Sequence, residues 1–381
     1  MNVRAIILLI TLMCAGALAS GQLYLVLPIA NETAQYYGIS TSSASLIGTA
    51  FGLAYAFGFL LWGPISDRFG RYPSLLVGLA LTASTTLCAG LMKDFQLLLL
   101  LRILQGICAA SIPPIGLALL SESLSEKFKP IGLAMMSFSF IVAAPTAQYY
   151  AKATGWHFST LLIAGGVVFA LCFFSLISLG AKHFSGTSHH KNSLIESFHF
   201  LKNDPLIITA WLTSITVLFG FVIFQAEMHG TLNIYHWHES LLSAFTVCGM
   251  LASFVAGSLI QKFGATMMTC IGLLCSIFAM MITLIVPQMI GLAIVLIGTG
   301  TALTLSSIIY IVSSRADDAS RGMAIAIYSF IVFLGASLAP IYVEMFSVGL
   351  TELFSIPLLL MLFSIVLLII AQKKTRSDSV V

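Results

Sequence analysis

The sequence predicts an all-α membrane protein in which twelve transmembrane helices form two pseudo-symmetric six-helix bundles. Hydrophobic residues make up 59% of the 381 residues and charged residues only 8%, whereas a soluble protein carries about 25% charged residues. Twelve apolar stretches are long enough to cross a bilayer, and short patterns of the first half return in the second. A surface with so few charges must face lipid over most of its area.

Each apolar stretch has at least about 20 residues, which as a helix crosses a hydrocarbon core of ~30 Å. None shows the in-and-out alternation of a membrane β-barrel strand. We place the stretches at residues 4–29, 44–65, 72–91, 95–120, 129–151, 157–181, 205–228, 239–262, 266–286, 288–314, 319–346 and 351–372.

The first stretch also resembles a secretory signal peptide, with Arg4 before the apolar run and Ala17-Leu18-Ala19 as a cleavage site. We expect it to stay as a helix, because apolar character continues through Leu27 and the repeat needs this span. The seven cysteines all lie in apolar stretches without a CxxC pattern, so we expect them to pack as small hydrophobic residues.

The distribution of basic residues predicts the orientation. With the N-terminus inside, fourteen Lys and Arg residues fall on the inner side, against Lys93 and Lys152 outside, and Arg102 lies within a helix. The positive-inside rule then places both termini in the cytoplasm. We expect a multi-pass protein of a bacterial inner membrane.

The two halves are predicted to be residues 1–181 and 205–381, joined by a cytoplasmic linker at 182–204. GPISDRFG at 63–70 aligns with GSLIQKFG at 257–264, and the same offset of 194 places Gln105-Gly106 on Thr299-Gly300. At an offset of 190, Ser139-Phe140-Ile141-Val142 returns as Ser329-Phe330-Ile331-Val332. Parallel repeats of this kind are typical of transporters that bind substrate between their halves.

GPISDRFGR resembles the loop signature of the major facilitator superfamily, roughly G-x-x-x-D-R-x-G-R-[RK], and LRILQGICAA at 101–110 resembles its fourth-helix signature, R-x-x-Q-G. With GQLYLVLP in the first stretch, the chain looks most like the bacterial twelve-helix drug:proton antiporters. The fifth stretch departs from their G-P-x-x-G-G pattern, since FIVAAPTAQYY keeps Pro145 without the glycines. That departure leaves the direction of transport open.

The first signature predicts a conformational latch made of Gly63, Asp67, Arg68, Gly70 and Arg71. Glycines suit a tight turn, and the resemblance implies that the Asp67 carboxylate faces the positive start of the eleventh helix near Ser320-Arg321-Gly322. Arg68 and Arg71 fix the topology and can pair with acids. The second copy has Gln261 and Lys262 and lacks the carboxylate, so a one-sided latch is expected. The alternative is a solvated loop that only sets topology.

Arg102 is an arginine within a predicted span, where a charge costs about 2.5–3.5 kcal/mol on insertion scales. We expect it to face the central cavity with Gln105 and Gly106 nearby. The resemblance implies a role in proton relay or in holding the protonation state of the cavity. The alternative is a structural cation bonded to helix carbonyls and Gln105.

A proton-coupled carrier needs an acid that changes charge, and Glu227 near the outer end of the seventh helix is the best-placed candidate. Glu32, Glu122 and Glu344 lie near other helix ends. Polar and aromatic groups, together with prolines, on otherwise apolar helices are candidates for the substrate cavity. Such groups can instead join helices to one another. The candidates are Gln22, Tyr24, Pro28, Pro145, Gln148, Tyr149, Gln225, Ser306, Ser307 and Tyr310.

His229, His236, His238 and Glu239 cluster in one outside loop, where solvated histidines are expected rather than a metal site. No GxxxxGK[ST] or hydrolase motif is present, so neither an ATP-driven mechanism nor an enzyme is predicted.

We expect a monomeric secondary transporter that exports small organic compounds at the expense of a proton gradient, with no cofactor and no nucleic-acid partner. The alternatives are uptake of a nutrient or siderophore-like metabolite, and a transport-inactive sensor or scaffold.

The topology can be tested with single cysteines placed in residues 182–204, in a background that lacks the native seven. A cytoplasmic linker should resist membrane-impermeant thiol reagents in intact cells and react once the cells are opened. Labelling from outside would contradict the predicted orientation.

Overall fold

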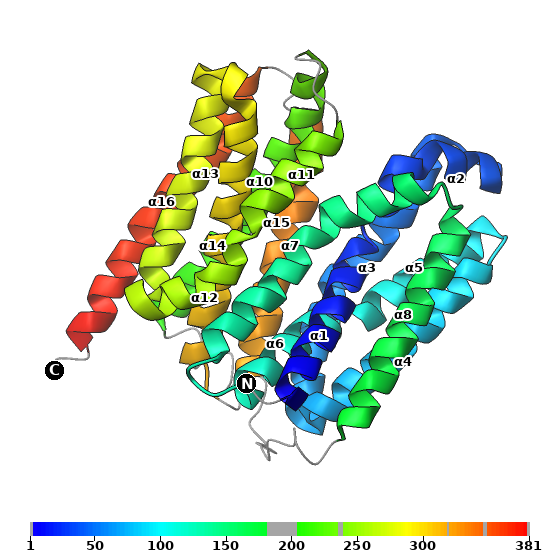
Figure 1. The fold of residues 1–381 in the computed structure, drawn as a ribbon, viewed down its shortest axis with the longest axis horizontal. Helices are drawn as coiled ribbons and strands as arrows, with labels where there is room; N and C mark the ends of the chain where they lie inside the picture. Colours follow the sequence, from blue (N-terminus) through cyan, green and yellow to red (C-terminus); the bar gives the residue numbers. More distant parts are fainter. Residues whose placement is uncertain (1–2, 181–203, 235–238, 318–319, 346–348, 379–381) are drawn as a thin grey trace. The chain divides into compact units, whose positions relative to one another are not determined.

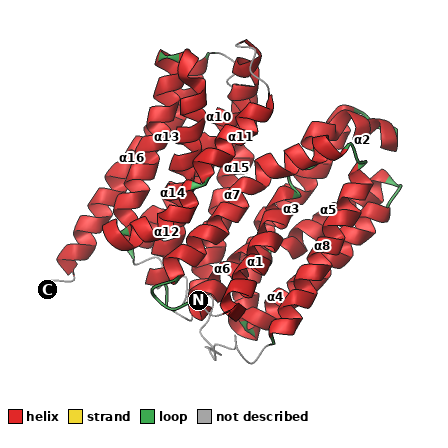
Figure 2. Cartoon of the chain, viewed as in Figure 1, coloured by secondary structure: helices red, strands yellow, loops and turns green. Residues whose placement is uncertain are grey.

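The computed structural model describes residues 3–180, 204–234, 239–317, 320–345 and 349–378. Within these ranges the secondary structure is helical, with loops between the helices and no strand (Figure 2). Twelve segments of the described chain are long and apolar enough to cross a membrane. The all-α, twelve-span prediction is therefore confirmed.

The described chain divides into two compact units, one of residues 1–125 and 139–192 and one of residues 126–138 and 193–381. The sequence division at 182–204 places residues 126–138 with the first half, and it stays a prediction. Of that linker, only Asp204 lies within the described residues.

The first unit consists of the helices that run from the N-terminus to Leu179, and Figure 1 shows them in blue to green. They are α1 (Val3–Gly21), the 3-10 turn η1 (Leu27–Ile29), α2 (Ala30–Tyr37), α3 (Thr41–Phe69), α4 (Arg71–Leu91), α5 (Phe95–Ala109), α6 (Ile112–Ser123), the later part of α7 (Lys129–Thr154) and α8 (Phe158–Leu179).

Polar contacts between spans hold the first unit together where lipid offers no hydrogen bonds. The Thr11 and Ser175 hydroxyls join α1 to α8 at 2.8 Å. The Tyr72 hydroxyl donates to Leu176 O at 2.6 Å, and the Trp62 indole donates to Ile107 O at 2.8 Å. Each contact satisfies a group that would be costly to leave unpaired in hydrocarbon.

The second unit contains the start of α7 and the remaining helices, which are α10 (Pro205–Ile234), α11 (Glu239–Met250), α12 (Ala252–Phe263), α13 (Ala265–Ile285), η3 (Pro287–Met289), α14 (Ile290–Arg315), α15 (Arg321–Met345) and α16 (Leu350–Asp378). Small residues let its helices approach closely, as is common in membranes. A Cβ added at Gly272 of α13 would lie 2.7 Å from Gly300 O of α14. An ion pair of 2.6 Å between Arg315 and Asp204 joins the end of α14 to the start of α10.

Three predicted spans, the first, fourth and eighth, are not single continuous α-helices. The eighth, predicted at 239–262, is interrupted at Leu251 between α11 and α12. The first span, predicted through residue 29, ends as an α-helix at Gly21, and Gln22–Val26 form turns. Its nineteen residues still measure about 28 Å at 1.5 Å per residue. The fourth span is interrupted between Ala109 and Ile112, directly before Pro113 and Pro114, which lack the N–H groups that a continuous helix needs.

Candidate functional site

The turn between α3 and α4 depends on glycine. Gly70 has φ 93° and ψ 147°, and its N–H donates to Ser66 O at 3.0 Å. Gly264 adopts the same conformation between α12 and α13, with φ 86° and ψ 150°. Residues with a side chain rarely adopt this region, so the glycines give both copies of the motif the same turn.

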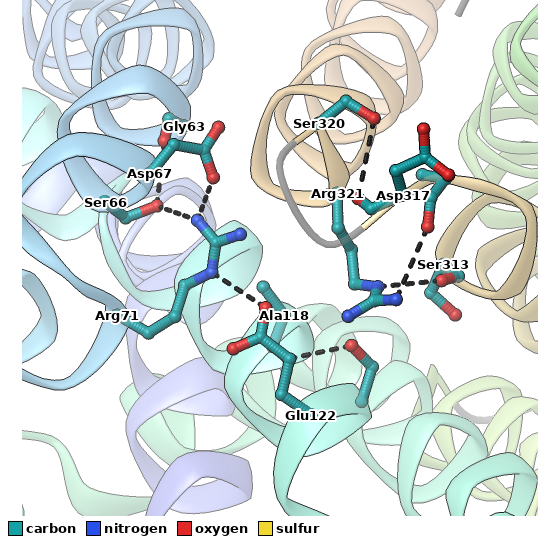
Figure 3. Close-up of polar contacts among 12 residues, drawn as sticks. Gly63, Ser66, Asp67, Arg71, Ala118, Glu122, Ser313, Asp317, Ser320 and Arg321 are labelled. Carbon is teal, nitrogen blue, oxygen red and sulfur yellow. Dashed lines mark hydrogen bonds and ion pairs between the residues drawn. The ribbon is translucent and has the colours of Figure 1, made fainter. Parts of the chain in front are cut away.

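Arg71 is the centre of an ion network at this turn (Figure 3). Its side chain is 9% exposed and donates to the Asp67 carboxylate, to Ser66 Oγ at 2.9 Å and to Glu122 Oε1 at 3.1 Å. Ser66 Oγ in turn donates to Gly63 O at 2.8 Å. One guanidinium thus joins the end of α3 to the end of α6 and balances two carboxylates.

The remaining latch residues differ in their surroundings. Arg68 is exposed, and its guanidinium lies 5.4 Å from the centre of the Phe69 ring. Glu122, one of the acids considered for proton coupling, is paired with Arg71. The predicted contact of Asp67 with the start of α15 would join the two units and stays a prediction.

The second copy of the motif carries no carboxylate but makes contacts of its own. Gln261, which matches Asp67, donates from Nε2 to Lys127 O. A Cβ added at Gly257, which matches Gly63, would lie 2.5 Å from Ile131 Cα and 2.7 Å from Ile131 N. The start of α7 therefore packs directly on α12 through uncharged groups, where the sequence had indicated only a lost charge.

Arg102 lies in α5 with its side chain fully buried. Its hydrogen-bond acceptors come from three elements: Ile47 O on α3 at 3.3 Å, Gln22 O at 2.7 Å and Gln22 Oε1 at 3.2 Å just after α1, and Gln105 Oε1 at 2.6 Å on α5 itself. The Phe51 and Phe158 rings cover the guanidinium, with centres 4.4 and 5.7 Å from it.

Gln105 and Gly106 support this arrangement. The Gln105 amide donates to Gln22 Oε1 at 3.3 Å and to Thr86 Oγ1 at 2.8 Å, which adds α4 to the cluster. A Cβ at Gly106 would lie 2.5 Å from Phe51 O, so glycine lets α5 approach the backbone of α3. The R-x-x-Q-G pattern thus supplies the cation, its amide partner and the close helix contact.

All hydrogen-bond partners of Arg102 among the described residues are neutral oxygens. These contacts are those of the structural cation considered from the sequence, with helix carbonyls and Gln105 as acceptors. A role in proton relay stays a prediction that rests on the resemblance.

The other predicted cavity residues are distributed over both units. In the first, Tyr24 follows α1 and is half-buried, while Pro145 is buried and Gln148 half-buried on α7. In the second, Gln225 Nε2 donates to Thr246 Oγ1 at 2.9 Å, and Tyr310 is half-buried near the end of α14.

Some candidate groups cannot be placed. The side chains of Glu227 and Glu344 lie outside the described residues, as do those of His229, His236, His238 and Glu239. Ser306 and Ser307 are buried on α14, and their hydroxyls have no hydrogen-bond partner among the residues that the structure describes. Sequence reasoning missed Thr86, Thr246 and Phe51, because an isolated threonine or phenylalanine in an apolar span carries no pattern.

The twelve candidate spans of the described chain, and the glycine turn that both copies of the motif share, define a polytopic membrane protein with an internal repeat. The Major Facilitator Superfamily model matches residues 12–340 and matches again over 223–379. The chain belongs to this superfamily and is therefore a transporter rather than an enzyme.

Several bacterial proteins are similar to parts of this chain. The inner membrane transport protein YnfM of Escherichia coli (strain K12) is 23% identical over 264 residues, 67% of this chain and 63% of YnfM, so the chain covers just under two thirds of that relative. A bicyclomycin resistance protein homolog of Haemophilus influenzae is 32% identical over 155 residues, 39% of each protein. The 4-hydroxybenzoate transporter PcaK of Pseudomonas putida is 30% identical over 144 residues, 37% of this chain and 32% of PcaK.

Among solved structures, the human organic anion transporter MFSD10 (TETRAN) matches with a TM-score of 0.77 over 97% of this chain and 100% of that one. The two sequences are 14% identical. This likeness establishes the shared fold.

The Arg71 network can be tested by Arg71→Gln. Removing the guanidinium leaves two partly buried carboxylates without their cation, which should cost about 1–3 kcal/mol or more. We expect a lower midpoint of thermal unfolding in detergent. Arg68→Gln is the matched control, since Arg68 is exposed, and should leave the midpoint unchanged. Equal midpoints for both variants would mean that Arg71 serves only topology.

The contact between α12 and α7 can be tested by Gly257→Val, which forces side-chain atoms against the backbone of Ile131. Overpacking of this kind typically costs about 1–3 kcal/mol. A single cysteine at position 131 should then react faster with a maleimide. Gly349→Val is the control, because nothing lies within 4 Å of a Cβ there. Unchanged reactivity in the Gly257 variant would show that α7 does not depend on this contact.

Proposed function

We propose that this transporter exports small organic compounds from the bacterial cytoplasm in exchange for protons, as a monomer that works by alternating access. The observation that carries the proposal is the presence in one unit of both motif sites: the Arg71 network at the α3–α4 turn and the Arg102–Gln105 pair in α5. These are the sites by which the sequence resembles drug:proton antiporters. The relative named for bicyclomycin resistance supports the same direction.

In the proposed transport cycle, the Arg71 network and the Arg102–Gln105 pair have different roles. The Asp67 carboxylate, at the end of α3, would favour one conformation through contact with a positive helix start, an interaction typically of about 0.3–1 kcal/mol and up to ~2 when partly buried. The Arg71 guanidinium holds that carboxylate in place. Arg102 keeps its charge at physiological pH and so cannot itself carry the proton. An acid must do so, and Glu227 remains the candidate.

Uptake is the second candidate function. It is favoured by the relative named as a 4-hydroxybenzoate transporter and by the residues around Pro145, which lack the glycines of drug exporters. Uptake and export use the same alternating access, so the direction of net flux is the property to measure.

The function can be tested with inside-out vesicles in which a pH gradient is imposed. For an exporter, an acidic lumen should drive accumulation of at least one compound from a panel of organic cations, neutral drugs and carboxylates, and a protonophore should abolish it. Accumulation driven instead by an acidic exterior would indicate proton symport and therefore uptake. Absence of gradient-driven flux for every compound, in either orientation, would favour the sensor or scaffold.

The contribution of Arg102 can be tested by comparing Arg102→Lys with Arg102→Ala. Lysine keeps the charge but loses the planar fork of donors, and alanine removes both. If the charge serves transport, lysine should retain part of the gradient-driven flux and alanine none, with both proteins inserted and monodisperse. Full transport by the alanine variant would contradict this role. An alanine variant that fails to fold would support the structural cation.

A further inference from the structure

The polar groups around Arg102 contain more hydrogen-bond donors than acceptors. We call Arg102, Gln22, Gln105 and Thr86 the donor cluster. A guanidinium offers five N–H groups and each side-chain amide two, and the structure gives Arg102 four hydrogen bonds. The Gln105 amide is fully used. Gln22 Nε2 is buried and has no hydrogen-bond partner among the described residues, although Gln22 Oε1 accepts from both Arg102 and Gln105.

Within the described part of the chain, the positive charge of the donor cluster has no ion-pair partner. No carboxylate among the described residues bonds to Arg102, and its acceptors are two backbone carbonyls and two amide oxygens. A buried cation is stabilised most by an anion with acceptor oxygens, and the planar guanidinium matches a carboxylate with two parallel hydrogen bonds. Because the cluster has unused N–H donors and a positive charge, it favours binding of an anion.

We propose that the donor cluster is the subsite for the carboxylate of a transported organic anion. The inference rests on the proposed function in one respect, that small organic compounds are transported. The Phe51 and Phe158 rings beside the guanidinium supply apolar contact for the body of the ligand. The predicted substrate class is therefore a small monocarboxylate with an aromatic or aliphatic body.

The local backbone indicates how a carboxylate gains access. Gln22 directly follows the last residue of α1, and Gln22–Val26 form turns in place of regular helix. This segment lies against α3, because a Cβ added at Gly48 would lie 3.2 Å from Leu23 O. Movement of Gln22 away from α3 withdraws its amide oxygen from Arg102 and opens that position to a carboxylate oxygen, so the guanidinium exchanges one acceptor for another.

The test is binding of matched acids and amides to the purified full-length protein in detergent. The probes are 4-hydroxybenzoate, benzoate and hexanoate, each with its uncharged amide of the same shape. The acids should bind at least tenfold more tightly than the amides. Gln22→Glu places a carboxylate beside Arg102 in the position of the ligand and should weaken binding of the acids at least tenfold. The control is Gln96→Glu. Gln96 is an exposed residue of α5, the helix that carries Arg102, so this variant makes the same charge change away from the cluster and should leave binding within twofold.

Equal binding of acids and amides, no binding of any acid, or a Gln22→Glu variant that binds acids like the unchanged protein would each overturn the proposal. Competition by chloride as strong as by the acids would also overturn it, since the site would then take inorganic anions. If Gln22→Glu does not fold, the ratio of acid to amide affinity in the unchanged protein decides.

Failure of the two proposals can be told apart. Gradient-driven flux of organic cations by a protein that binds no carboxylate would overturn the subsite and leave the exporter. Selective binding of acids by a protein that moves none of the panel compounds would support the subsite and contradict transport.

Discussion

Enclosure of the Arg102 guanidinium is the constraint on which the first unit depends. A charge within a span is tolerated only if its donors find acceptors, and here the acceptors come from the end of α1, from α3 and from α5. Gln105 extends the same cluster to Thr86 on α4. The charge thereby joins four elements to one another, and one of the contacts lies directly at the end of α1. The carbonyl of Gln22, just beyond the helix, is an acceptor for Arg102.

Close backbone contact at glycine makes that enclosure possible. Gly106 brings α5 onto Phe51 O, and Phe51 then covers the guanidinium at 4.4 Å. The same device appears in the second unit at Gly257, where α12 meets the backbone of α7. The two motif copies thus share a turn made by Gly70 and Gly264, but one carries an ion network and the other an amide and a glycine contact. The backbone geometry of the motif is therefore present in both units, whereas its carboxylate is present only in the first.

The sequence predicted the class of fold and the family because those depend on long-range averages: apolar length, charge placement and a motif repeated at a fixed offset. It predicted the ends and interruptions of helices less well, because these depend on single residues. The Gln22 carbonyl just beyond the end of α1 accepts from Arg102, eighty residues later, and no local pattern reports that contact. The interruption before Pro113 and Pro114 had a local signal, because proline lacks the N–H group that a helix needs. That signal lies within a long apolar stretch, which was predicted as one continuous span. Gln105 could be named from its motif, whereas Thr86 and Phe51 could be found only from contacts between helices.

The most direct test of this account is hydrogen exchange, measured by mass spectrometry, in Arg102→Gln and in the unchanged protein. If Arg102 anchors the end of α1, peptides that cover residues 21–29 should exchange faster in the variant. Peptides from α13 (Ala265–Ile285), in the other unit, should exchange at the same rate in both proteins and serve as the internal reference. Equal exchange of residues 21–29 in a folded variant would contradict the claim that this buried charge organises the unit.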